Sequence, residues 1–301
     1  MNATPLYAAI EAGGTKINVA VGSGPADIRR RARIATRHPD ETMPEIAAFL
    51  DGAVAEFGPL AGLGIATFGP ADLDPASPTY GCVFAGTKPG WDDTDILGPF
   101  VRQLGCPAAI DTDVNGAALG EARWGAGKGF ESIVYFTVGT GIGGGFVQDE
   151  KTRHGLTHPE MGHVLVRRHP HDAYPGICRF HGDCVEGLAS GPAIRDRLGA
   201  PLDELPEDHP FRAILADYLG QLCAQAVFLL SPQRIVLGGG VMNAGGLHGP
   251  VTDAMRRYLA GFIPHPRLKG DDYLVPPALG DDAGIAGAFA LAMDASRRAS
   301  R

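Results

Sequence analysis

Two cysteines and two histidines in the middle of the chain have the side-chain types and the spacing of a metal site. Cys178, His181 and Cys184 form the pattern C-x2-H-x2-C, and His163 precedes them in the same segment. Zinc prefers thiolate and imidazole ligands, and four of them close a structural site. We therefore predict bound Zn²⁺ on these four residues. A Cys178–Cys184 disulfide and ordinary polar loop histidines are the alternatives, and a cytoplasmic setting disfavours the disulfide.

Three glycine clusters each follow an apolar stretch, where backbone N–H groups can converge on a phosphate. They are Gly13-Gly14, the run from Gly139 to Gly145, and Gly238-Gly239-Gly240. One cluster alone predicts no more than a tight hairpin, whereas three in one chain favour phosphate binding. The second run also satisfies the G-x-G-x-x-G expression of dinucleotide-binding oxidoreductases. That fingerprint must open a helix, and we expect a strand to follow here.

The first glycine turn carries further groups that suit a nucleotide phosphate. The stretch Glu11-Ala12-Gly13-Gly14-Thr15-Lys16 combines a carboxylate, a hydroxyl and an ammonium. These are the groups needed around a phosphate and its Mg²⁺.

Two acids, Asp111 and Asp113, lie where a strand should end and a helix begin. We expect such a position to present a side chain into a cleft between domains. For either acid alone, capping of the following helix is the simpler interpretation.

The elements that position these groups alternate between strands and helices. Apolar runs predict strands, 3.6-residue periodicity predicts helices, and alternation of the two favours an α/β layer architecture. The long histidine-rich stretch 151–183 shows little periodicity, and we interpret it as a functional loop. The expected strands are 7–12, 16–21, 29–37, 62–67, 108–111, 132–137, 141–148 and 234–237, and the expected helices are 45–57, 92–104, 114–124, 211–229 and 283–296.

Length and composition narrow the class of protein. The chain has 301 residues, which suits two domains or one large one. The net charge is −8, and the charged residues are interspersed along the chain. A nucleic-acid partner is therefore not expected. There is no unbroken apolar run of about 18 residues and no basic leader at the start. We expect a cytoplasmic protein that does not bind a membrane.

The glycine turns resemble the phosphate motifs of the ROK sugar kinases, which belong to the actin and hexokinase superfamily. Glu11–Lys16 resembles the first phosphate motif, Thr137–Gly145 the second, and Leu237–Met242 the adenosine motif. The resemblance implies that ATP and Mg²⁺ bind at these turns, with Ser190 near the nucleotide. The nucleotide-binding residues it implies are Gly13, Gly14, Thr15, Lys16, Gly139, Thr140, Gly141, Ser190, Gly238, Gly239 and Gly240.

The same resemblance assigns the catalytic and sugar-binding side chains. It makes Asp113 the base that accepts the proton of the attacking sugar hydroxyl. It places Glu160, His163 and Glu186 on the sugar, with the zinc ion ordering their loop. Thr112 stands where many glucokinases of the family carry Asn, and His181 replaces a usual cysteine. These departures resemble the fructokinase branch.

The resemblance implies two ribonuclease H-like (actin-like ATPase) α/β domains around a cleft, with a zinc-binding loop insertion. Residues 1–112 and the C-terminal helix 283–301 would form the first domain, and residues 113–282 the second, with the zinc loop at 151–185. The implied activity is ATP-dependent phosphorylation of D-fructose at its 6-hydroxyl, in a homodimer. A glucose or mannose kinase is the nearest alternative. A sugar-binding regulator and a nicotinamide-dependent oxidoreductase are the more distant ones.

Overall fold

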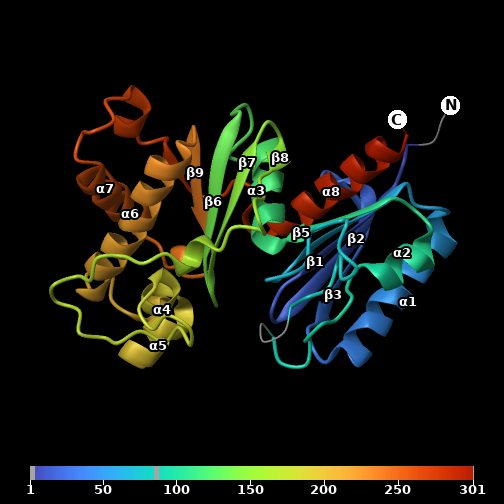
Figure 1. The fold of residues 1–301 in the computed structure, drawn as a ribbon, viewed down its shortest axis with the longest axis horizontal. Helices are drawn as coiled ribbons and strands as arrows, with labels where there is room; N and C mark the ends of the chain where they lie inside the picture. The colour runs from blue at the N-terminus through green and yellow to red at the C-terminus, as the bar shows by residue number, and fades with distance from the viewer. Residues whose placement is uncertain (1–3, 85–87, 301) are drawn as a thin grey trace. The chain divides into compact units, whose positions relative to one another are not determined.

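The computed structural model describes residues 4–84 and 88–300, which form two compact units. Unit 1 comprises residues 4–84, 88–125, 152–158 and 279–300, and unit 2 comprises residues 126–151 and 159–278. The chain therefore enters unit 1 three times. The ribbon is drawn in Figure 1.

Unit 1 is built on a mixed five-stranded sheet in the order β3-β2-β1-β4-β5. Strands β1 and β2 form a hairpin across the first glycine cluster, and β1, β4 and β5 run parallel. Every residue of β4 is buried, as expected of a central strand covered on both faces. The strands are β1 (Tyr7–Ala12), β2 (Lys16–Gly24), β3 (Asp27–Ala35), β4 (Gly62–Thr67) and β5 (Ala108–Thr112).

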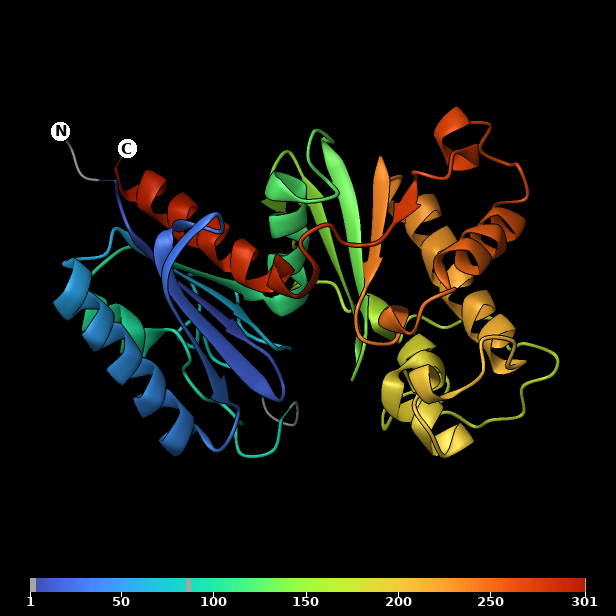
Figure 2. The ribbon, with the colours of Figure 1, turned by 180° about the vertical axis from the view of Figure 1, so that it is seen from behind.

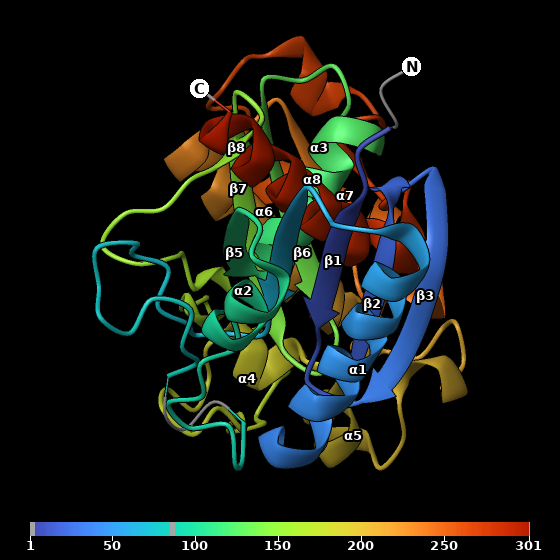
Figure 3. The ribbon, with the colours of Figure 1, turned by 90° about the vertical axis from the view of Figure 1, so that its right-hand side faces the viewer.

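Helices cover both faces of this sheet. Helices α1 (Pro39–Phe57) and α2 (Gly98–Leu104) lie on one face, and α8 (Ala283–Ala299) lies on the other, as Figures 1 and 2 show. Figure 3 looks onto the face that α1 and α2 cover. Helix α3 (Asp113–Trp124) packs against α8. Two apolar clusters result, a large one on the α1 side and a smaller one in which Phe289 and Ile285 meet small side chains of β1 and β4.

The contact between α3 and α8 requires glycine. A Cβ atom on Gly287 would lie 1.8 Å from the carbonyl oxygen of Gly116, so no larger residue fits without separating the helices. We predicted that the second domain begins at residue 113. In the structure α3 belongs to unit 1, because this close packing joins it to α8.

Unit 2 repeats the strand order of unit 1. Its sheet has the order β10-β9-β6-β7-β8, with β6 and β7 forming a hairpin across the second glycine cluster and β6 parallel to β9. Helices α4 to α7 accompany it and bury one large apolar core. The strand β8 (Lys151–Thr152) stands at the boundary, since its second residue, Thr152, belongs to unit 1. The other elements are β6 (Ser132–Val138), β7 (Ile142–Gln148), α4 (Val185–Ala189), α5 (Gly191–Leu198), α6 (Phe211–Leu230), β9 (Arg234–Gly238), α7 (His248–Leu259) and β10 (Leu274–Val275).

Helix α6 is long and apolar enough to cross a membrane by length and composition alone. Two-thirds of its most apolar stretch, 67%, is buried inside the protein. Leu215, Leu219 and Leu222 of this helix belong to the core of unit 2. Its apolar character is therefore explained by packing.

The predicted helix over residues 92–104 is wrong in its first half, because α2 begins at Gly98. Asp95 Oδ1 accepts hydrogen bonds from the backbone N–H groups of Leu97, at 3.1 Å, and Gly98, at 2.6 Å. An aspartate side chain that accepts from the backbone N–H groups two and three residues after it stabilises a turn instead of a helix. Pro99 then occupies the first helical turn, where its missing N–H costs nothing.

Candidate active site

The base candidate Asp113 is the first residue of α3, directly after β5. The helix is capped by its neighbour: Thr112 Oγ1 accepts a hydrogen bond from the backbone N–H of Asn115 at 3.2 Å. Asp113 Oδ1 accepts from the backbone N–H of Val114 at 2.8 Å. Because Thr112 supplies the cap, capping does not explain the presence of an acid at position 113.

Asp113 and the first glycine turn both follow the carboxyl ends of parallel strands in the sheet of unit 1. In the parallel register Ala12 pairs with Thr67, and Thr67 pairs with Thr112. Gly13, which follows β1, and Asp113, which follows β5, therefore lie at the same end of the sheet. This end, beyond the carboxyl ends of parallel strands, is where α/β sheets bind their ligands.

The first turn is a tight connection between β1 and β2. The backbone N–H of Gly13 donates to the carbonyl of Lys16 at 2.9 Å, and Gly14 has open space where a Cβ would stand. Glu11 accepts a hydrogen bond from Asn18 Nδ2 at 2.7 Å. Burial raises the pKa of Glu11, and the bond from Asn18 opposes that effect. A carboxylate oxygen is the ligand type that Mg²⁺ prefers.

In unit 2 the second and third glycine turns lie together beside Ser190. The backbone N–H of Gly191 donates to the carbonyl of Gly139 at 2.7 Å, and that of Val241 donates to Val138 at 2.9 Å. Gly239 has a φ of +95°, and a Cβ there would meet the carbonyl oxygen of Val138 at 2.4 Å. Ser190 is buried and caps α5, accepting a hydrogen bond from the N–H of Ala193. Backbone N–H groups at a helix N-terminus and at glycine turns are groups that can bind an anion.

The second turn does not have the structure of a dinucleotide-binding fingerprint. The G-x-G-x-x-G run from Gly139 continues directly into strand β7, which pairs antiparallel with β6. A fingerprint of that class opens a helix whose N-terminus binds the pyrophosphate. The oxidoreductase alternative therefore loses the one motif that suggested it.

Glu160 and Glu186 lie close enough to influence each other. Burial, together with the charge of Glu186, raises the pKa of Glu160 to about 6. Glu186 Oε2 accepts a hydrogen bond from the backbone N–H of Ile142 at 2.9 Å. Glu186 is thereby attached to the second glycine turn.

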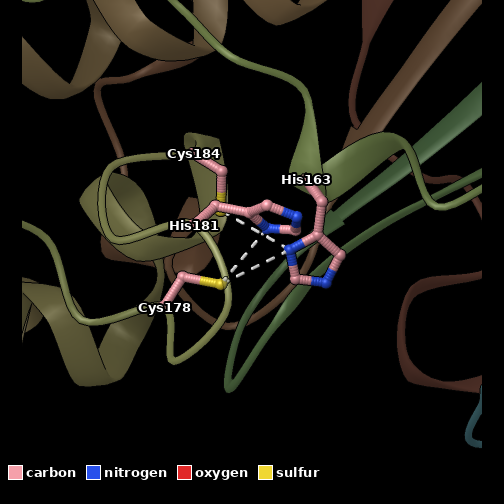
Figure 4. Close-up of side chains that lie close together, drawn as sticks. All are labelled: His163, Cys178, His181 and Cys184. Atoms are coloured by element: carbon pink, nitrogen blue, oxygen red, sulfur yellow. Dashed lines mark hydrogen bonds between the residues drawn. The ribbon is translucent and has the colours of Figure 1, made fainter.

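The four predicted metal ligands converge, as Figure 4 shows. Their ligand atoms all lie within 4.8 Å of one another. His163 Nδ1 is 3.5 Å from Cys184 Sγ and 3.8 Å from Cys178 Sγ, and Cys178 Sγ is 3.5 Å from His181 Nδ1. Zinc bonds of about 2.3 Å to sulfur and about 2.0–2.1 Å to nitrogen place tetrahedral donors about 3.5 Å apart. The set fits zinc in both ligand type and spacing.

His163 faces two groups with its two ring nitrogens. Nδ1 points to the cysteine sulfurs, whereas Nε2 lies 3.9 Å from Glu186 Oε1. A metal-binding imidazole commonly directs its second nitrogen at a carboxylate. The two roles predicted for His163 therefore use different atoms of one ring.

The sequence did not predict the polar cluster around Asp111, whose own side chain is 2% exposed, whereas that of His154 is 32% exposed. Its carboxylate accepts hydrogen bonds from Asn115 Nδ2 at 2.7 Å, Thr152 Oγ1 at 2.7 Å, and His154 Nε2 at 3.1 Å. The hydrogen bond to Asp111 raises the pKa of His154. The only signal in the sequence was a pair of acids two residues apart.

Comparison with known proteins gives matches over nearly the whole chain. The ROK family pattern matches residues 7–295. A fructokinase from Zymomonas mobilis subsp. mobilis is 44% identical over 304 residues, which cover 99% of each chain. The structure of a ROK hexokinase from Thermus thermophilus aligns with a TM-score of 0.80 and 28% identity, over 97% of this chain and 99% of that one. A ROK family glucokinase from Streptomyces griseus, solved in complex with glucose and AMPPNP, aligns with a TM-score of 0.72 and 27% identity, over 96% and 99%. The α/β architecture with two sheets is confirmed.

Proposed function

This chain belongs to the ROK family, and from that premise we propose that it transfers the γ-phosphoryl group of ATP to the 6-hydroxyl of D-fructose. The observation that carries the proposal is the near full-length relation to a fructokinase at 44% identity, against 27% to a glucokinase. The Asp113 site and the glycine turns supply the chemistry that such a reaction needs.

Asp113 is the general base of the proposed reaction. Its carboxylate accepts the proton of the sugar hydroxyl as that oxygen attacks the γ-phosphorus. One P–O bond forms, the bond to the β-phosphate oxygen breaks, and ADP leaves. General-base assistance contributes about 10²–10⁴ in rate, and most of the remaining catalysis of phosphoryl transfer comes from positioning and electrostatic stabilisation.

The nucleotide is assigned to the glycine turns. Backbone N–H groups of the second and third turns and the N-terminus of α5 at Ser190 suit the phosphates and the adenosine. Gly13, Gly14, Thr15 and Lys16 of the first turn suit the transferred phosphate. Mg²⁺ would neutralise the phosphate charge, and Glu11 offers an oxygen ligand at that turn.

The sugar is assigned to Glu160, Glu186 and His163 Nε2. Ionised carboxylates accept hydrogen bonds from several hydroxyls, which suits a hexose. Zinc held by His163 Nδ1, Cys178, His181 and Cys184 would fix the loop that carries these groups. Its part in the reaction is thus indirect.

We assign the enzyme to the cytoplasm and expect it to act as a homodimer, by analogy with its family. A glucose or mannose kinase is the alternative outcome of the test below, since the same groups serve any hexose.

The test is a coupled ADP assay over fructose, mannose and glucose, with NAD(P) reduction measured separately. We expect the highest kcat/KM on fructose, and a loss of at least about 10²-fold in kcat for Asp113→Asn with the fold retained. A preference for glucose of tenfold or more contradicts the fructose assignment. Activity retained in Asp113→Asn contradicts the assignment of the base.

A further inference from the structure

The hydrogen-bonded cluster at Asp111 joins two parts of unit 1 that are distant in the sequence. Asp111 and Asn115 lie on either side of Asp113, at the end of β5 and in the first turn of α3. Thr152 and His154 come from the short segment 152–158, which belongs to unit 1 although the chain on both sides of it belongs to unit 2. His158 anchors the other end of that segment, where its Nε2 accepts from the backbone N–H of Ala71 at 3.2 Å.

The donors around Asp111 satisfy both of its carboxylate oxygens. The backbone N–H of Thr112 and the amide of Asn115 donate to Oδ1, Thr152 Oγ1 donates to Oδ2, and His154 Nε2 lies 3.1 Å from each oxygen. An ionised carboxylate can only accept, so the Nε2 hydrogen of His154 is directed at Asp111. Such charge-assisted bonds are about twice as strong as neutral ones.

This arrangement fixes the backbone on both sides of Asp113. The side chain of Asn115 is tied to Asp111, and its backbone N–H is tied to the Thr112 cap at 3.2 Å. Asn115 is fully buried. Asp113 thus lies between two residues, Asp111 and Asn115, that are bonded to each other. Thr152 and His154 hold Asp111 from the other side, and we call these contacts the Asp111 clamp.

We propose that His154 and Thr152 are positioning residues for the base Asp113, acting through Asp111. They hold the carboxylate of Asp113 where it can take the proton of the sugar hydroxyl. They do not touch the substrate themselves. The proposal rests on the proposed function, because it concerns the orientation of that base. A misplacement of about 1 Å at a reacting group can cost about 10²-fold in rate.

The test compares Thr152→Val and His154→Ala with Thr157→Val as a matched control. Thr157 lies in the same segment, and its hydroxyl donates to the neighbouring carbonyl of His158. We expect kcat for hexose phosphorylation to fall about 10- to 100-fold in both cluster variants, with KM for ATP within about twofold of the wild type. Thr152→Ser, which keeps the donor, should restore kcat, and Thr157→Val should leave it unchanged.

Amide hydrogen exchange over residues 113–116 gives a readout that does not depend on activity. We expect faster exchange there in Thr152→Val and His154→Ala than in Thr157→Val. If amide exchange and kcat of Thr152→Val and His154→Ala match those of Thr157→Val, the proposal is overturned. Faster exchange with an unchanged kcat in these two variants would overturn it as well. If the wild type phosphorylates no hexose, the proposed function fails, while the exchange data still decide whether the clamp exists.

Discussion

Among single residues, Thr112 caps a helix directly before Asp113, at a position where we also predict an influence on the choice of sugar. Its hydroxyl caps α3, and asparagine caps a helix as well as threonine does. A Thr112→Asn change therefore leaves the helix start intact while it adds an amide that can bond a sugar hydroxyl.

We predict that Thr112→Asn raises the ratio of glucose to fructose kcat/KM by about two- to tenfold, the equivalent of one neutral hydrogen bond. Steady-state assays on both sugars measure this ratio. Asp113→Asn serves as the control and should suppress both reactions. A Thr112→Asn ratio that moves toward fructose speaks against a role for this position in sugar choice.

The Asp111–His154 pair predicts a pH dependence of folding stability. The hydrogen bond to Asp111 raises the pKa of His154 above its ordinary value of 6.5. A histidine with a raised pKa in the folded state contributes stability that is complete below pH 6.5 and is lost as the pH rises through the folded value. We expect the free energy of unfolding of the wild type, relative to His154→Gln, to be larger at pH 6 than at pH 9.

Urea denaturation of both proteins at the two pH values measures this difference. A difference between wild type and His154→Gln that is constant with pH would mean that His154 carries no charge in the folded protein.

The sequence predicted the types of the functional residues better than their arrangement. The candidate metal ligands were recognisable because Cys178, His181 and Cys184 follow one another at short spacing. The different surroundings of Asp111 and Asp113 could not be predicted from the sequence. The partners of Asp111 include Thr152 and His154, which lie about forty residues further along the chain.

Among the elements, strands and long helices were predictable because their apolar pattern is local. Strands β1, β4 and β6 and helices α3, α6 and α8 lie where the sequence predicts them, to within a few residues. Helix α7 was missed although Val251, Met255 and Leu259 show helical spacing. Helices α4 and α5 have five and eight residues, which is too short for periodicity to show.

The packing of α3 on α8 predicts an intolerance of any side chain at Gly287. Gly287→Ala should lower the free energy of unfolding by about 1–3 kcal/mol or more, because its Cβ would overlap the backbone of Gly116. Gly249→Ala in α7 is the matched control, since a Cβ there meets nothing within 4 Å. That variant should be neutral or slightly stabilising. Equal stability of the two variants in thermal unfolding would contradict this account.

For the whole molecule, the cluster of His163, Cys178, His181 and Cys184 predicts one zinc ion per chain. Burial raises the pKa of Cys184 to about 11, so without a metal its thiol is neutral, and zinc binding releases its proton. Elemental analysis of protein purified without added metal should give one zinc. Removal by a chelator, or Cys184→Ser, should lower both zinc content and melting temperature. Full zinc and unchanged stability in Cys184→Ser would exclude the four-ligand site.

Both units use the same strand order and begin with a hairpin across a glycine turn. The second hairpin was predictable as a copy of the first. The chain's return at 152–158 to unit 1 was not predictable, because its anchors are single polar contacts of Thr152, His154 and His158, which leave no periodic pattern in the sequence.

The place of α8 in unit 1 has a consequence for synthesis on the ribosome. Strands β1 and β4 emerge early, but the helix that covers Ala9 and Ala66 is made last. At about 5–20 residues per second, that face of the nascent sheet stays uncovered for roughly ten seconds or longer. The sheet formed by the first 125 residues therefore waits for α8 before both of its faces are covered, and one apolar face stays exposed in the meantime.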